Sequence, residues 1–522
     1  MGYQIIFGGQ QADGQQVLSR VLAVQYRSMV KFYVTTAIPY VNARPHLGHA
    51  LEYVQADVIR RYHRLIGDEV HLVSGADENA LKNVQAAEKA GVEVKTFLER
   101  NSDIFRKFYA DLGVELNGFR RGTDEKFHWP GVQELWKRCN IAGDIYKKTY
   151  KGLYCVGCEQ FYLPKDLVDG KCPAHLKEPE EVAEENYFFK LTRYQKQLED
   201  LIESNELNII PEHRRNEVLS FVKQGLEDFS ISRSNQRARK VGVPIPGDDS
   251  QKVYVWFDAL TIYMTAVGYG YDEKLWNKWW PADLHIIGKD IIRFHCVYWP
   301  AMLLSAGLPL PRTVFSHGFI TSNGQKMSKT IGNVIDPYDL INKYGVDALR
   351  YYLLREIPPF DDGDITLKRF AEVYQADLAN GLGNLVQRVA KMGEGLDLGK
   401  LQLEEGSEVN LLKKIEPLIQ SFKFNEALEI IWREVSGIDK YISRKEIWAL
   451  PSEEKQRELN RIIHGTEGIT GLRDIAEALQ PFMPETAERI REIFQGPKVV
   501  APEKPLFPRL AKIAKISENH EL

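Results

Sequence analysis

The first strong pattern of apolar positions begins at Lys31. Phe32, Tyr33 and Val34, followed by two threonines, are aromatic or β-branched, and this composition predicts a short buried strand. Beyond a stretch broken by proline and glycine, apolar residues recur three and four apart over 51–65, the spacing of one helix face. A second apolar run over 69–74 predicts another strand. Strand, helix and strand at this separation form a βαβ unit, so we expect a parallel sheet.

The same periodicities continue along the chain. Helical spacing is found over 94–112, 129–142 and 261–267, and apolar runs over 253–256 and 285–287 are expected to add strands to the sheet. From about residue 370 to the end the pattern is almost wholly helical. We therefore expect an α/β fold in which a doubly wound, Rossmann-like parallel sheet is followed by an α-helical bundle.

Composition adds limits to this picture. The chain has 522 residues, which are too many for a single core, so about three domains are expected. Of these residues, 44% are hydrophobic and 27% are charged. The net charge of −4 means that any nucleic acid must be bound by local basic patches. Five cysteines are few for this length and argue for a reducing compartment. No apolar run is long enough to span a membrane, so a cytoplasmic location is expected.

Residues 1–28 fit none of these patterns. They are rich in glutamine, and their apolar run over 17–24 is too short and too mixed for a secretory signal. Serine is scarce, which gives little support to a transit peptide. We expect this segment to be a disordered extension.

Four candidate metal ligands cluster after residue 150. Cys155 and Cys158 form a C-x2-C pair, and thirteen residues later Cys172 and His175 form a C-x2-H pair. Three thiolates and one imidazole make a closed tetrahedral set for Zn²⁺, with no position left for a substrate. Unrelated thiols are the alternative, but two ligand pairs at this spacing rarely coincide. The sequence therefore predicts one structural zinc knuckle.

The loop before the first helix contains His46-Leu47-Gly48-His49. Free N–H groups at a helix start attract anions, the glycine lets a phosphate approach the backbone, and the two rings add donors. Two solvated histidines would explain such a motif more simply if it stood alone. Asp77 directly follows the second strand and so lies at the same edge of the sheet. Its carboxylate suits a substrate ammonium group, with helix N-capping as the commoner alternative.

A second motif favours a functional role for the two histidines over simple solvation. Lys326-Met327-Ser328-Lys329-Thr330 follows an Asn-Gly turn, and together with the H-x-G-H junction it resembles the class I aminoacyl-tRNA synthetases. The resemblance runs in the same order from about residue 31 nearly to the C-terminus. Four further segments narrow it to the methionyl-tRNA synthetase family, of bacterial type with a single zinc knuckle: Ile38-Pro39-Tyr40, Gly75-Ala76-Asp77-Glu78, Trp256-Phe257-Asp258-Ala259 and Gly288-Lys289-Asp290-Ile291.

The resemblance implies activation of L-methionine by Mg²⁺-ATP to methionyl-adenylate, followed by transfer to the 3′-terminal adenosine of tRNA(Met). It gives catalytic roles to His46, His49, Lys326 and Lys329. It assigns ATP binding to Gly48, Gly288, Asp290 and Ser328. It assigns methionine binding to Ile38, Tyr40, Asp77, Trp256, Ala259, Tyr263, Ile291 and His295.

The spacing of the pocket residues agrees with this assignment. Ala259 and Tyr263 are four apart, as are Ile291 and His295, so each pair shares one helix face. Aromatic walls suit a long, polarisable side chain such as methionine, and the Tyr263 hydroxyl is expected to donate to its sulfur. An ordinary aromatic core has the same spacing. Leu260 stands where many family members have proline.

The resemblance also sets domain boundaries. We expect a first catalytic half at 29–142, a connective insertion with the zinc knuckle at 143–250, and a second catalytic half at 251–316. A linker at 317–370 carries the lysine loop, and 371–522 forms the anticodon-binding bundle. An insertion of this length is too short for the editing domain of the isoleucyl, valyl and leucyl enzymes. The chain lacks the extension through which some members dimerise, so a monomer is expected.

Anticodon recognition is expected on one helix of the bundle. Asn384 and Arg388 are four apart, opposite an apolar stripe, and a merely solvated face would have the same spacing. Both match the family's anticodon helix. Trp448 matches a family tryptophan on a neighbouring helix, although Ile447 replaces the usual proline before it.

The sequence alone leaves two other functions open. A small-molecule nucleotidyltransferase can share the H-x-G-H helix but has no use for a long helical bundle. A catalytically silent tRNA-binding relative is disfavoured by the intact His46, His49, Lys326 and Lys329.

Overall fold

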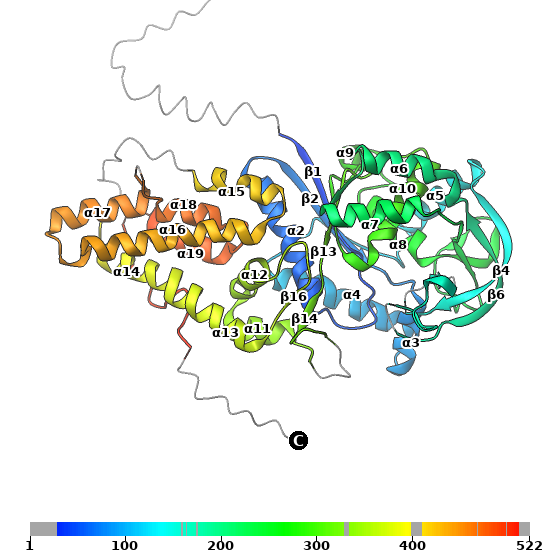
Figure 1. Ribbon diagram of the computed structural model, residues 1–522, viewed down its shortest axis with the longest axis horizontal. Helices are drawn as coiled ribbons and strands as arrows, with labels where there is room; N and C mark the ends of the chain where they lie inside the picture. The colour runs from blue at the N-terminus through cyan, green and yellow to red at the C-terminus, as the bar shows by residue number, and fades with distance from the viewer. Residues whose placement is uncertain are drawn as a thin grey trace, which may run out of the picture.

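The computed structural model describes residues 29–157, 160–162, 164–173, 176–327, 333–397, 410–466, 468–496 and 498–510. The expected extension 1–28 lies outside these residues. A sheet domain and a helical bundle lie side by side, and helix α2 (Leu47–Leu65) runs through the region where they meet (Figure 1). The expected α/β fold with a C-terminal helical bundle is confirmed.

Six parallel strands form the central sheet, in the order β3-β2-β1-β12-β13-β7. The order reverses between β1 and β12, so the carboxyl ends of these two strands face a crevice in which doubly wound sheets bind ligands. The strands are β1 (Lys31–Thr36), β2 (Glu69–Ala76), β3 (Gly118–Arg121), β7 (Asn208–Ile210), β12 (Leu284–Gly288) and β13 (Thr313–His317).

Alternation along the strands divides the interior into two cores. Val34 and Phe315 point into one core and their neighbours Tyr33 and Val314 into the other, because successive side chains of a strand face opposite ways. The first core contains the buried face of α2 and continues without a break into the helical bundle. The second core contains α5 (Trp129–Ile141), α8 (Val255–Thr265) and α10 (Trp299–Ser305). Helices therefore cover both faces of the sheet, as a doubly wound fold requires.

Two antiparallel sheets fill most of the range expected for the insertion. The long strands β4 (Ile145–Cys155) and β6 (Glu180–Phe189) pair along their length, flanked by β5 (Gln160–Tyr162) and β8 (Phe229–Ser230). A smaller sheet contains β9 (Ser232–Ser234), β10 (Pro244–Ile245) and β11 (Asp248–Val253). The same range also supplies β7 to the parallel sheet, with α6 (Gln195–Glu203) and α7 (Glu212–Lys223) beside it.

One strand expectation was wrong. The run 253–256 does not resume the parallel sheet, because β11 ends at Val253 in the small antiparallel sheet and α8 begins at Val255. Every residue of α8 is buried, and so its sequence lacks the polar face that marks most helices. A fully apolar run of this kind cannot be told from a buried strand by its periodicity.

The lysine motif begins on a tight hairpin. Strands β14 (Ile320–Ser322) and β15 (Gln325–Lys326) are joined by Asn323 and Gly324, both with positive φ, as a type I′ turn requires. Asp364 of β16 (Gly363–Asp364) accepts from the Gly324 N–H over 2.8 Å and from the Thr321 hydroxyl over 2.7 Å. The first strand and the turn of the hairpin are therefore both held by β16, and helices α11 (Pro337–Tyr344) and α12 (Val346–Arg355) lie between β15 and β16 in the chain.

The described part of the bundle is mostly helical, and its last described segment, 498–510, contains no helix. Its first helix changes winding: α13 (Leu367–Val373) passes into a π-helical stretch, Tyr374–Gly383, and then into α14 (Asn384–Met392). The others are α15 (Leu411–Gln420), α16 (Phe424–Lys445), α17 (Ser452–His464), α18 (Leu472–Leu479) and α19 (Pro484–Gln495). The helices α3 (Leu81–Lys89), α4 (Val94–Asp111) and α9 (Glu273–Trp279) complete the catalytic part. Within the described residues, no helix is both long and apolar enough to cross a membrane.

Candidate active site and anticodon site

The two motif histidines form the start of α2. His46 is its N-cap: the Gly48 N–H donates to Nδ1 of His46 over 3.1 Å, and the His46 N–H donates to Nδ1 of His49 over 3.1 Å. The two rings lie 3.9 Å apart. Because each Nδ1 accepts a hydrogen bond, each neutral ring carries its proton on Nε2. The surrounding protein lowers the pKa of His46 to about 4 and that of His49 well below its usual value, so both rings are neutral donors at pH 7.

A second polar pair lies behind these histidines. Glu52, one turn further along α2, accepts from the Ala37 N–H over 2.8 Å and lies 3.2 Å from Nε2 of His317 at the end of β13. Nδ1 of His317 lies 2.8 Å from the Gly318 carbonyl and must therefore carry a proton. Burial raises the pKa of Glu52. Burial alone would lower the pKa of His317, but the hydrogen bond and charge of Glu52 raise it, so the pair retains a shared proton.

Gly288 and Asp290 lie at the same edge of the sheet. Gly288 ends β12, and a Cβ on it would approach the Asp290 carboxylate to 3.0 Å, so a larger residue here would have to displace that side chain. The Asp290 carboxylate is exposed and close enough to Glu52 and His317 to influence both. The neighbouring Lys289 is anchored by Asp362 over 2.7 Å, which fixes the turn. The expected ATP residues Gly48, Gly288 and Asp290 thus gather at one crevice.

The expected methionine residues converge beside it. Trp256 stacks on Phe294 with ring centroids 3.7 Å apart, and Tyr40 meets the Trp256 ring edge-on at 6.2 Å. Tyr40 also forms a β-bridge with Asp77, which brings the expected ammonium ligand to this wall. Ile38 is partly buried and packs in the same core, and Ala259 is buried on α8.

The hydrogen bonds of Tyr263 correct one expectation. Nδ1 of His295 lies 3.0 Å from the Ile291 carbonyl and must donate to it, which leaves Nε2 as an acceptor. The Tyr263 hydroxyl lies 2.8 Å from this Nε2 and donates its single proton to it. Burial lowers the pKa of His295 to about 4, so the ring stays neutral. Tyr263 therefore has no proton left to donate to a thioether sulfur, and the two side chains form a fixed wall.

Lys82 is a pocket residue that the sequence pattern did not reveal. Its ammonium lies 3.0 Å from the centroid of the Tyr40 ring and donates to the Gly157 carbonyl over 3.2 Å. Gly157 lies between the expected ligands Cys155 and Cys158, so Lys82 connects the insertion to Tyr40. Glu52 and His317 were also missed. The available signals were the position of Glu52 one turn after His49 and of His317 at a strand end.

Part of each remaining motif lies outside the described residues. Ser328 and Lys329 are outside them, and only the backbone of Lys326 is described. Of the expected zinc ligands, Cys158 and His175 are outside. Cys155 and Cys172 are described, and both are buried: Cys155 ends strand β4, where it pairs with Gln160, and Cys172 lies in a turn. The Leu176 N–H donates to the Cys172 carbonyl over 2.8 Å, closing this turn.

The anticodon candidates come together on the bundle. The Arg388 guanidinium lies 5.9 Å from the centroid of Trp448, and Asp439 of α16 holds it through an ion pair of 2.5 Å. Trp448 is 50% exposed, whereas Ile447 beside it is fully buried. Ile447 therefore anchors the turn and leaves the tryptophan face open to solvent. Asn384 lies one turn before Arg388 and accepts from Arg509 over 3.4 Å.

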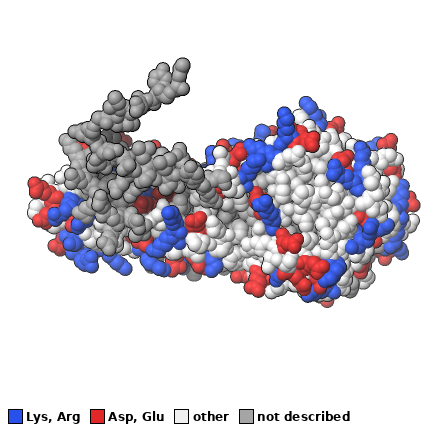
Figure 2. Space-filling view, turned by 90° about the horizontal axis from the view of Figure 1, so that it is seen from above, with Lys and Arg blue, Asp and Glu red and all other residues white. Residues whose placement is uncertain are grey.

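Charged side chains of both signs are interspersed over the face seen in Figure 2, as the small net charge of −4 suggests. Where this face is not drawn in grey, the described residues form no wide patch of one sign.

Comparison with known proteins agrees with this geometry. The family model of the class I tRNA synthetases for methionine, "tRNA synthetases class I (M)", matches residues 32–182 and 174–390. The methionine–tRNA ligase of Thermotoga maritima is 39% identical over 490 residues, which are 91% of this chain and 76% of that protein. The Mycobacterium tuberculosis ligase is 42% identical, covering 89% of this chain and 92% of that protein.

The chain belongs to the methionyl-tRNA synthetase family.

A solved structure of this family has the same fold as this chain. Mycobacterium tuberculosis methionyl-tRNA synthetase in complex with methionyl-adenylate superposes with a TM-score of 0.84 at 38% identity, covering 92% of this chain and all of that one. The activity of this chain is methionine–tRNA ligation, with methionine, ATP and tRNA(Met) as its substrates. Family membership excludes both the nucleotidyltransferase and the catalytically silent alternative.

Proposed function

We propose that methionyl-adenylate forms at the carboxyl edge of the parallel sheet, with the ATP triphosphate at the start of α2. The observation that carries this proposal is the reciprocal pair of hydrogen bonds through which the backbone fixes both His46 and His49 as Nε2–H donors. The donors are set before the substrate arrives, so no reorganisation is needed when negative charge develops on the phosphates. Lys326 and Lys329 would add positive charge from the hairpin, and Mg²⁺ bound with ATP would neutralise further charge.

Methionine would lie against the wall made by Tyr40, Trp256, Tyr263 and His295. Asp77, bridged to Tyr40, supplies the carboxylate for its ammonium group. The stacked and edge-on rings provide the polarisable contacts that a thioether favours. Selectivity then depends on shape and on aromatic contact, because the Tyr263 proton is already used by His295.

The adenosine would lie on the other side of the crevice. Gly288 allows close approach to the backbone, and the exposed Asp290 carboxylate suits ribose hydroxyls. We add Glu52 and His317 to this side, because their hydrogen bonds join α2 to the end of β13 at this point. In this arrangement the methionine carboxylate attacks the α-phosphorus and pyrophosphate leaves. A hydroxyl of the terminal adenosine of tRNA(Met) then attacks the acyl carbon, the acyl–phosphate bond breaks and AMP leaves.

One zinc ion is proposed in the insertion. Cys155, Cys158, Cys172 and His175 would hold it; of the two described cysteines, both buried, Cys155 ends strand β4 and Cys172 lies in a turn. With four protein ligands the ion would be structural and would hold these segments together. Through Lys82 this part of the insertion contacts Tyr40, so loss of the metal would reach the pocket only indirectly.

Asn384, Arg388 and Trp448 are proposed to read the anticodon. An exposed indole with a guanidinium 5.9 Å away suits a splayed RNA base, which is stacked on a ring and bonded at its edge. A monomeric state, a cytoplasmic location and the domain boundaries remain predictions from the sequence.

The most direct test is pyrophosphate exchange measured with each of the twenty amino acids. Exchange that depends on methionine, with leucine at least ~100-fold poorer, is the expected result for a pocket that rejects branched side chains by shape. Equal exchange with leucine and methionine would contradict the assigned pocket. Exchange without any charging of tRNA(Met) would separate the adenylate site from the assigned RNA site.

A further inference from the structure

The side chain of Arg350 on α12 is fully buried, an uncommon position for a charged group. Its Nε donates to the Phe482 carbonyl over 2.8 Å, and Nη2 donates to the Pro481 carbonyl over 3.0 Å. Nη1 donates to the Leu112 carbonyl over 3.1 Å and lies 2.9 Å from the Asp57 carboxylate. One guanidinium is therefore bonded to groups from several parts of the chain.

These partners belong to different domains. Asp57 lies on α2, and Leu112 is the residue that follows α4, so both are parts of the catalytic domain. Pro481 and Phe482 lie in the turn between α18 and α19 of the bundle. Arg350 itself lies in the linker between the two domains. A planar fork with fixed donor directions can bond all of these at once, which the single ammonium of a lysine cannot do.

The catalytic-domain partner is itself firmly held. Asp57 accepts from Arg61 over 2.6 Å and from Arg60 over 3.3 Å, so its carboxylate is fully occupied. Asp57 lies eight residues after His49 on the same helix, roughly 12 Å along its axis. The helix that carries the catalytic histidines at its start is thus clamped to the bundle near its middle.

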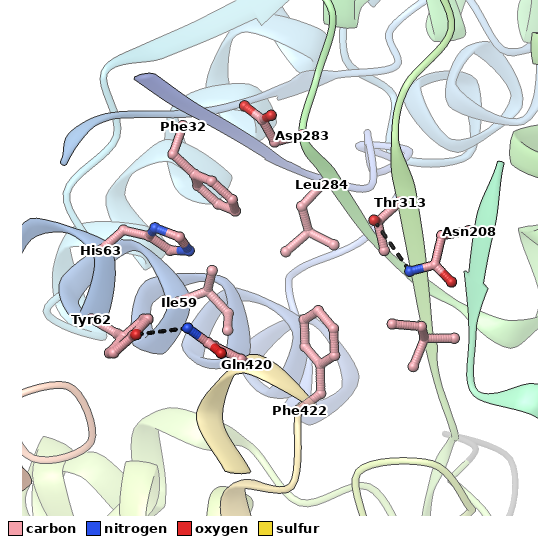
Figure 3. Close-up of a pocket in the computed structure, with 11 residues that line it drawn as sticks. Phe32, Ile59, Tyr62, His63, Asn208, Asp283, Leu284, Thr313, Gln420 and Phe422 are labelled. Carbon is pink, nitrogen blue, oxygen red and sulfur yellow. Dashed lines mark hydrogen bonds between the residues drawn. The ribbon is translucent and has the colours of Figure 1, made fainter. Parts of the chain in front are cut away.

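A second contact between α2 and the bundle is less tightly packed. The Tyr62 hydroxyl accepts from the Gln420 amide over 2.9 Å and donates to Glu416. Beside it, Ile59, Leu284 and Phe422 line a cavity of about 170 Å³, which Figure 3 shows between α2, the sheet and the bundle. Empty volume means missing contacts, so this contact restrains the bundle less than the buried one at Arg350.

We propose that Arg350 is a positioning residue that fixes the bundle relative to the helix of the catalytic histidines, so that charging of full-length tRNA depends on it while methionine activation does not. A tRNA that contacts both sites at once binds best when their separation is already set. A loosened joint lowers the population of the competent arrangement and weakens only the reaction that uses both sites. The inference rests on the anticodon role proposed above for the bundle.

Arg350→Lys tests this contact. The lysine keeps a positive charge beside Asp57 but cannot reach the carbonyl groups of the bundle at the same time. For full-length tRNA, kcat/KM is expected to fall roughly 10- to 100-fold, since the second contact becomes less effective. Methionine-dependent pyrophosphate exchange, and charging of an acceptor-stem hairpin without an anticodon, should stay within about twofold, since neither uses both sites.

Tyr62→Phe is the matched control, because it removes hydrogen bonds of α2 to the bundle without touching Arg350 and should leave all three activities unchanged. Asp57→Asn, which keeps an oxygen acceptor, approaches the contact from the other side and should repeat the Arg350→Lys pattern more weakly.

Parallel losses in exchange, hairpin charging and tRNA charging in both variants would mean a purely structural arginine and overturn the inference. An unchanged kcat/KM for tRNA would overturn it too. If Trp448→Ala leaves tRNA charging unaffected, the anticodon proposal fails instead.

Discussion

The backbone N–H of His46 donates to Nδ1 of His49, and this bond fixes the side chain that follows it by one helical turn. Together with the bond from Gly48 to His46, it satisfies two N–H groups that a helix start would otherwise leave free. The same two bonds place the proton of each neutral ring on Nε2. A cap that stabilises the helix thus also presents two Nε2–H donors to the crevice.

His46→Ala is expected to lower the turnover of methionine-dependent pyrophosphate exchange by about 100- to 1000-fold, as removal of one transition-state donor typically does. The KM for methionine should change little, because the lost bond is made to the phosphates. His63→Ala, at the other end of the same helix, is the matched control and should keep its exchange rate. Similar turnover in the two variants would remove His46 from the catalytic groups.

Tyr263→Phe is expected to slow exchange with methionine and with norleucine to the same extent. Norleucine has a methylene in place of the sulfur, and the Tyr263 proton bonds to His295 rather than to the ligand. The variant leaves Nε2 of His295 without its donor, a loss of about 1–3 kcal/mol in unfolding free energy for a buried group. A loss confined to methionine would mean that the hydroxyl contacts the sulfur after all.

Asp347→Asn is expected to change how stability depends on pH. Burial raises the pKa of Asp347 to about 6, and its carboxyl accepts from the Thr486 N–H at the start of α19 over 2.6 Å. The folded state therefore keeps a proton that the unfolded chain releases near pH 4, and this group's contribution to stability falls as pH rises from about 4 to 6. Relative to the variant, the parent should lose about 3 kcal/mol over this window.

Chemical unfolding of both proteins at several pH values measures this difference. The comparison cancels the contributions of the histidines, because both proteins contain the same ones. Parallel pH profiles would mean that Asp347 is ionised in the folded protein.

Cys172→Ser is expected to lose a tightly bound zinc ion and to loosen the insertion, with exchange reduced only indirectly. Elemental analysis of protein purified without chelator measures the metal. Cys139→Ser, at a buried cysteine of α5 outside the knuckle, should retain one zinc per chain. Zinc-free parent protein would contradict the knuckle assignment.

Trp448→Ala is expected to weaken charging of tRNA(Met), since stacking on an exposed ring is worth roughly 1–3 kcal/mol per base. Exchange should remain intact, because half of the indole surface is open to solvent and little packing is lost. Trp448→Phe keeps a ring and should keep most of the charging activity. Exchange that falls as far as charging would make Trp448 a core residue.

Sequence patterns predicted the parts of the fold that alternate between apolar and polar positions. Helix α4 was expected within one residue of its observed ends because it has one clear buried face, and strand β1, which is buried on both faces, because its residues are aromatic or β-branched. Helix α8 was misread over 253–256, because burial on all sides removes the polar face that marks a helix. Strand β7 has three residues, too few for any periodicity.

Some residues of the candidate site could likewise be predicted from the sequence, and others could not. The motifs predicted roles for His46, His49 and the residues of the aromatic wall, because each motif is a short run of sequence at the end of a strand or the start of a helix. Glu52 and His317 are 265 residues apart, and their contact depends on the sheet bringing β13 next to α2. Which partner takes the Tyr263 proton depends on the His295 ring, whose direction no spacing encodes. Contacts between distant segments were the part that the sequence left open.

One core begins at Val34 and Phe315 and passes through α2 into the bundle. This continuity affects how such an enzyme could change during evolution. A tRNA-reading bundle with its own closed interior could be exchanged between catalytic domains as a module. Here the bundle completes the interior behind His46 and His49, and α2 belongs to both. Recombination at residue 370 would therefore leave two incomplete interiors, so, with the anticodon residues proposed above, new tRNA specificity would arise more readily by substitution on the exposed faces of α14 and around Trp448.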